Sequence, residues 1–196
     1  MFDSYYEDGA LTVPLTRFDN VNGLPLRSAD LPVDFEVFVG DLDANHVLHA
    51  ESDPGVDDIV ITPTHAIPVW SGDQVVIAGT ERRGPAGNGY LYEAQNGGTT
   101  GGSAPAFPEV LGATVDDNGI TWKCTKRCVE PTNMKLAPTQ GDLATAVAGA
   151  ALSLGTQVVG GLAGAVSFWV RIEGVPDGVE GLNLSPTSNA CVVDPV

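Results

Sequence analysis

The side chains that could do chemistry are few in this 196-residue chain, and they lie far apart. Cys124 and Cys128 are four positions apart, a spacing that fits half of a zinc site, but no second pair of ligands follows. Two small residues at a strand end, or a local disulfide, are the alternatives. With only one further cysteine, Cys191, a disulfide scaffold is excluded. We predict no metal and no cofactor.

The histidines and the glycine-rich run do not build a catalytic site either. His46 and His49 are three apart, and in a strand that spacing points side chains to opposite faces. We therefore expect exposed loop histidines. The glycine run at 97–102 lacks the lysine and the following helix of a phosphate-binding loop. We predict no catalytic residues, and we expect a protein that is not an enzyme.

The charge of the chain is strongly negative, with 25 Asp and Glu against 9 Lys and Arg, a formal net charge of −16. Such a field repels a phosphate backbone, so we predict no nucleic-acid partner. The charge is uneven. Residues 1–65 hold 13 acidic and 2 basic side chains, whereas residues 66–128 hold 6 and 5. The middle segment therefore has a different kind of surface, and it is a candidate for a separate unit.

A stretch of 28 residues at 143–170 carries no charge. Its length would satisfy a membrane-spanning helix, but glycines interrupt it, polar side chains punctuate it and positively charged flanks are missing. We expect buried strands joined by glycine turns, and no membrane partner. The N-terminus has neither the basic nor the apolar region of a secretion signal.

Apolar residues recur with the period of β-strands. In "VDFEVFVG" every second residue from Val33 to Val39 is apolar, and Asp34 and Glu36 fall on the other face. We predict further strands at 58–62 and 165–172, weaker ones at 151–155 and 156–159, and at most one short turn of helix near 139–149. With 24 Gly and 14 Pro between short apolar runs, the chain is predicted to be all-β, a β-sandwich.

The middle segment predicts a small β-meander. "YLYEA" at 90–94 places Tyr90 and Tyr92 on one face, and "TVDDNGITW" at 114–122 is a hairpin whose turn is centred near Asn118-Gly119. A unit of this size needs aromatic rings for its core, which Phe107 would join. The alternative is an exposed platform that stacks on sugars. Its candidate glycan-binding residues are Trp70, Tyr90, Tyr92 and Trp122.

The segment 69–124 resembles a module of virion proteins from tailed bacteriophages. In that module a Tyr-x-x strand, a Gly-Thr-Ser/Thr-Gly loop, a Pro-x-Trp-Pro corner and a Gly-x-Thr-Val-x-Asp-Gly-x-x-Trp hairpin follow in this order. The chain matches them with "YLYEA", "GGTTGG", "PAFP" and "GATVDDNGITW". Phe107 replaces the tryptophan of the corner, and the hairpin turn is one residue longer.

The flanking segments resemble the two halves of an immunoglobulin-like sandwich found in phage structural proteins. The resemblance implies three parts: an N-terminal arm at 1–29, a sandwich made of 30–65 and 129–196, and a small β-module at 66–128 inserted into it. Two consecutive domains divided near residue 130 are the alternative.

We therefore expect a structural component of a tailed-phage virion, an accessory decoration or cement protein or a head–neck joining protein. Its partners would be capsid, neck or tail subunits and further copies of itself, and its location the virion, assembled in the bacterial cytoplasm. The arm supplies candidate partner-binding residues, which are Phe2, Tyr5, Tyr6, Leu11 and Phe18. The alternative is a tail, baseplate or fibre protein that binds a host-surface glycan.

Overall fold

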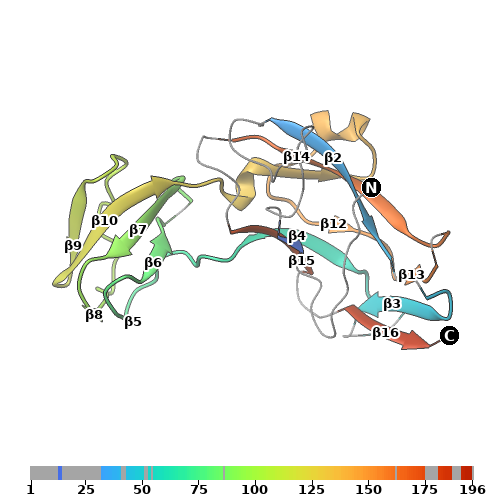
Figure 1. Ribbon diagram of the computed structural model, residues 1–196, viewed down its shortest axis with the longest axis horizontal. Coiled ribbons are helices and arrows are strands. Elements are labelled where there is room, and N and C mark those ends of the chain that lie inside the picture. The colour runs from blue at the N-terminus through green and yellow to red at the C-terminus, as the bar shows by residue number, and fades with distance from the viewer. Residues whose placement is uncertain are drawn as a thin grey trace.

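The fold is all-β, as the computed structural model in Figure 1 shows. The structure describes residues 13–14, 32–40, 43–50, 53, 55–85, 87–161, 163–174, 181–186 and 191–195. Within these ranges the regular elements are β-strands and two short 3-10 helices, and the sheets are antiparallel. Two units lie side by side in Figure 1. We call residues 70–127 the small module and residues 66–69 and 128–130 the first and second linkers. The other described residues are the main unit.

The main unit holds ten strands among the described residues, in three sheets ordered β1-β15-β4-β12, β11-β14-β2 and β13-β3-β16. In chain order its elements are β1 (Val13–Pro14), β2 (Val33–Val39), β3 (His46–Ala50), β4 (Val60–His65), η3 (Pro131–Asn133), β11 (Met134–Ala137), η4 (Gly141–Ala144), β12 (Leu152–Ser153), β13 (Gln157–Val159), β14 (Val166–Ile172), β15 (Leu182–Pro186) and β16 (Cys191–Pro195).

The pairing of β2 with β14 follows from the alternation seen in the sequence. Phe35 and Val37 are buried on one face, and the buried Val170 and Phe168 lie directly opposite them. Val39 and Ile172 are buried on the same face. On the other face Asp34 lies directly across from Arg171, and its carboxylate accepts two guanidinium hydrogen bonds at 2.7 Å. The hydrogen bond from Arg171 lowers the pKa of Asp34. A slip of one residue would expose the apolar face and break this pair.

The core of the main unit is built from chain segments that precede the small module in the sequence and from segments that follow it. Strands β2 and β4 precede the module, and their partners β14, β12 and β15 follow it. One hydrophobic cluster joins them, and its buried members include Phe35, Ile61, Met134, Phe168 and Leu182. The chain therefore leaves the main unit after β4 and re-enters it before β11.

The small module is a four-stranded sheet, β6-β7-β10-β9, with a two-stranded sheet, β5-β8, beside it. Its strands are β5 (Val75–Val76), β6 (Glu81–Arg83), β7 (Tyr90–Ala94), β8 (Gly98–Thr99), β9 (Thr114–Asp117) and β10 (Ile120–Arg127). The predicted hairpin turn is confirmed. Asp117 pairs with Ile120, and Asn118 and Gly119 between them have positive φ angles of 53° and 85°. Two positive φ angles are what a tight hairpin turn requires.

Some sequence expectations were wrong. The expected loop histidines lie in strand β3, and His49 is buried at 5% exposure. Glu81–Arg83, for which no strand was predicted, forms strand β6. The uncharged stretch, in contrast, forms strands as expected, namely β12, β13 and most of β14, and the 3-10 helix η4 lies at its start. Within the described ranges, no helix has both the length and the apolar character needed to cross a membrane.

Candidate functional site

The small module is organised around one buried carboxylate. Asp117, which is 4% exposed, ends strand β9 just before the hairpin turn. Its Oδ2 accepts the indole N–H of Trp70 at 2.8 Å and that of Trp122 at 3.0 Å. Its Oδ1 accepts the backbone N–H of Gly101 at 2.8 Å. One side chain thus joins the entry of the module, the glycine-rich loop and the hairpin.

The glycine-rich loop packs closely against the hairpin at Gly98 and Gly101, where a side chain would not fit without a shift. A Cβ at Gly101 would lie 3.0 Å from Asp117 Oδ1, and one at Gly98 would lie 2.9 Å from a side-chain carbon of Ile120. Between them Thr100 is buried, and its hydroxyl donates to the carbonyl of Ser71 at 2.9 Å. The glycines therefore allow the backbone of the loop to lie close to the hairpin.

The proline corner adds the remaining ring. The centroid of Phe107 lies 4.5 Å from that of Tyr92, 6.2 Å from that of Trp70 and 6.3 Å from that of Trp122. The Tyr92 hydroxyl donates to the carbonyl of Pro108 at 3.0 Å. It also accepts a hydrogen bond from the Asn88 amide at 2.8 Å. Burial raises the pKa of Tyr92 to about 12.

These rings form the core of the module. Trp122 and Tyr92 are fully buried, and Trp70 is 9% exposed. Tyr90 is half-buried beside Arg127, whose guanidinium lies 5.7 Å from the ring centroid. A stacking platform needs a free ring face, so the burial of Trp70, Tyr92 and Trp122 contradicts their assignment as glycan-binding residues. The candidate partner-binding residues Phe2, Tyr5, Tyr6, Leu11 and Phe18 lie outside the described residues.

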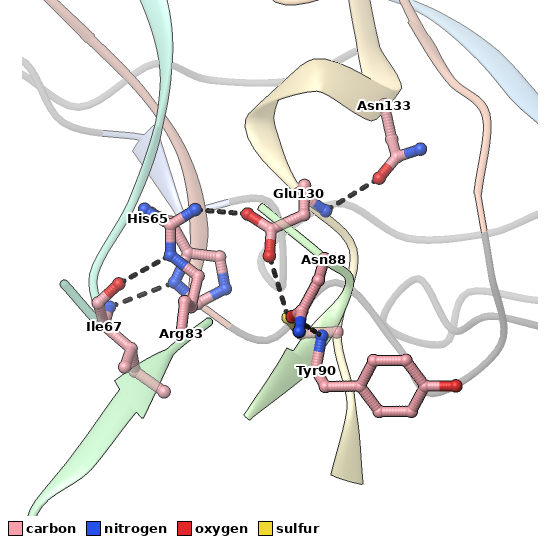
Figure 2. A network of polar contacts seen from close by, with 8 residues as sticks. His65, Ile67, Arg83, Asn88, Tyr90, Glu130 and Asn133 are labelled. Atoms are coloured by element: carbon pink, nitrogen blue, oxygen red, sulfur yellow. Dashed lines mark hydrogen bonds and ion pairs between the residues drawn. The ribbon is translucent and has the colours of Figure 1, made fainter. Parts of the chain in front are cut away.

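A second cluster of polar side chains lies where the two units meet, and Figure 2 shows it. The chain crosses there twice, through a first linker at 66–69 and a second linker at 128–130. His65 Nδ1, at the end of β4, accepts the backbone N–H of Ile67 at 3.0 Å. Arg83 Nε, on β6, donates to the carbonyl of Ile67 at 2.8 Å, and its NH1 forms an ion pair with Glu130.

The same chain of contacts continues into the main unit. The backbone N–H of Glu130 donates to the side-chain carbonyl of Asn133 at 2.8 Å, and the N–H of Asn133 donates to the carbonyl of Glu130 at 2.8 Å. Asn133 belongs to η3, the first element after the second linker. Hydrogen bonds and one ion pair therefore run from β4, across both linkers, to η3 (Figure 2).

Burial sets the electrostatics of this junction. The side chains of Arg83 and Glu130 are 11% and 4% exposed, so neither charge is well solvated. Burial, together with the nearby positive charge of Arg83, lowers the pKa of His65 to about 4. Within the described residues, the buried Nε2 of His65 has no hydrogen-bond partner. His65 is therefore neutral near pH 7.

The thiols of Cys124 and Cys128 are buried and have low reactivity. Cys124 and Cys128 are buried and free, so the disulfide considered from the sequence does not form between them. The Cys128 thiol donates to Glu130 at 3.4 Å. Burial is the largest cause that raises its pKa to about 12. A thiol held neutral is a poor nucleophile.

Sequence reasoning missed the residues that organise both clusters. Asp117 was considered only as part of a turn, although the hairpin motif contains both this acid and Trp122. Arg83 and Glu130 are 47 residues apart and belong to no motif. In the part of the chain that the structure describes, no group of three His, Cys, Asp or Glu side chains could hold a metal ion.

Comparison with known proteins adds no relative. The chain matches no protein-family model, no curated protein and no solved structure. Any functional inference therefore depends on the residues and their geometry, together with the resemblance described above.

Proposed function

We propose that this chain is a non-enzymatic structural component of a tailed-phage virion, which binds neighbouring subunits as a decoration, cement or head–neck joining protein. One observation carries the proposal. The pieces of the phage-like series converge on a single core: the loop through Gly101, the corner through Phe107, and the hairpin through Asp117 and Trp122. The motif residues therefore form the core of the small module. The resemblance to the phage module thus covers a complete folded unit.

We further propose that the main unit is an immunoglobulin-like sandwich. Its support is that sheets β11-β14-β2 and β1-β15-β4-β12 both contribute to one hydrophobic cluster, with strands from either side of the small module paired to each other. Antiparallel sheets that share a core in this way are the basis of a sandwich.

The contacts of the two buried carboxylates, Asp117 and Glu130, support a structural role. Asp117 accepts three hydrogen bonds from its own module, and Glu130 is engaged by Arg83, Cys128 and Asn133. Each has an architectural partner. The tail, baseplate or fibre alternative needs exposed rings among Trp70, Tyr90, Tyr92 and Trp122. Three of these are buried and Tyr90 is half-buried, which favours the structural role.

The proposal is tested by mixing the purified chain with particles assembled from the encoding genome after this gene has been deleted. We expect the chain to sediment with those particles and to saturate at a fixed copy number. A second chain that lacks residues 1–11 keeps Val13 and Pro14, which pair with β15, but loses four of the five candidate partner-binding residues, all except Phe18. We expect it to bind more weakly. If the full chain never sediments with the particles, the proposal is wrong.

A further inference from the structure

The two units have separate interiors. The hydrophobic cluster of the small module contains residues from 70 to 124, and that of the main unit shares no residue with it. No described sheet contains strands from both units. Figure 1 shows them side by side, joined where β4 leads out and where β10 leads back. The angle between the units is therefore set at the junction.

At that junction Arg83 contacts both linkers. Its backbone N–H donates to the carbonyl of Pro68 in the first linker at 2.9 Å, and its own carbonyl accepts the backbone N–H of Trp70, the first residue of the small module, at 2.8 Å. Its side chain then reaches the carbonyl of Ile67 with Nε and the carboxylate of Glu130 with NH1. A guanidinium presents several donors in a fixed plane, which suits two acceptors at once.

The acceptor Glu130 is also enclosed by the small module. A Cβ at Gly87, which has a φ angle of +62°, would lie 3.4 Å from the Glu130 carboxylate. The Cys128 thiol contacts the other carboxylate oxygen. If Arg83 alone were removed, a buried carboxylate would remain without its cation, which is strongly unfavourable. In the structure the two side chains are only 11% and 4% exposed, so the closed junction keeps both charges largely away from water.

We propose that the Arg83–Glu130 pair is a latch that fixes the orientation of the small module on the main unit. With the pair closed, the two linkers act as one rigid connection. With the pair broken, the folded module reorients on its linkers while both cores stay intact. This inference does not depend on the proposed function, since it concerns only the geometry of the junction.

The test compares backbone residual dipolar couplings of the two units in weakly aligned solution. In the unsubstituted chain we expect one alignment tensor to fit both units. In Arg83→Met and in Glu130→Gln, we expect the common tensor to be lost, with a smaller alignment magnitude for the small module than for the main unit. The indole N–H signals of Trp70 and Trp122 report whether the Asp117 core remains formed.

The matched control is Glu81→Gln, which removes the exposed pair between Glu81 and Lys126, 3.9 Å apart within the small module. We expect it to keep the common tensor. The latch is refuted if both junction variants keep one tensor. It is also refuted if both lose the indole signals, because the cluster would then serve the folding of the module and not its orientation.

Discussion

Trp70 donates its indole N–H to Asp117 at 2.8 Å, although the two residues are 47 positions apart. This contact closes the small module, because Trp70 stands at its entry and Asp117 lies in its last hairpin. The same carboxylate oxygen holds Trp122. The stability of the module is therefore expected to depend on one acidic side chain more than on any exposed charge.

Replacement of Asp117 tests this dependence. Asp117→Ala leaves two indole N–H groups and one backbone N–H without their acceptor, and each unsatisfied buried donor costs about 1 to 3 kcal/mol. We expect the free energy of unfolding, measured by urea denaturation, to fall by about 3 kcal/mol or more. Glu109→Ala, at an exposed acidic side chain of the same module, is the control and should change it by less than about 0.5 kcal/mol. Equal effects would contradict the role given to Asp117.

The hairpin turn offers a test of backbone conformation. Gly119 has a φ angle of +85° and open space around its Cβ position, so Gly119→Ala introduces strain without a clash. We expect it to lower the free energy of unfolding by about 1 kcal/mol. Gly102→Ala is the matched control. Gly102 has no positive φ, and a Cβ added there would lie 3.8 Å from the nearest atom, in the side chain of Asp73. A larger loss at Gly102 than at Gly119 would overturn the assignment of the turn.

The junction histidine predicts a pH dependence of stability. The pKa of His65 is about 4 in the folded chain, against an ordinary value of 6.5. As the pH falls from 6.5 to 4, the unfolded chain binds a proton that the folded chain does not, so the free energy of unfolding decreases over this range. Below about pH 4 the contribution of His65 levels off.

His65→Asn isolates this contribution, because asparagine keeps an acceptor near the N–H of Ile67 and does not titrate. We expect urea denaturation at a series of pH values to show a flatter decline between pH 6.5 and 4 in the variant. Asp34 and Asp43, whose pKa values are lowered below 3.8, contribute at lower pH in both proteins. Identical profiles between pH 6.5 and 4 would show that His65 is not neutral and buried in the folded state.

Much of the fold could be predicted because it follows from local patterns. The alternation in β2 and β14 placed Phe35 and Phe168 on the buried face, and Asn118-Gly119 indicated the turn. Strand β6 was missed because Glu81–Arg83 is charged and short, and it pairs because β7 lies beside it. His49 is buried in β3, the central strand of its sheet, a position that nothing in the local sequence indicates.

The candidate sites were harder to predict, because they depend on contacts between distant residues. The need for aromatic core rings was predictable, but the convergence of Trp70, Gly101 and Trp122 on Asp117 was not. It arises from the order of the strands in the sheet. The Arg83–Glu130 pair likewise exists only because the chain crosses between the units twice.

The most direct test of the central claim is a cryo-electron microscopy reconstruction of the intact particle made by the encoding genome. The account predicts density for both the main unit and the small module at symmetry-related positions, in contact with neighbouring virion subunits. The account would be contradicted by a well-resolved reconstruction of an otherwise complete particle that has no density for this chain, with the chain recovered free in the lysate.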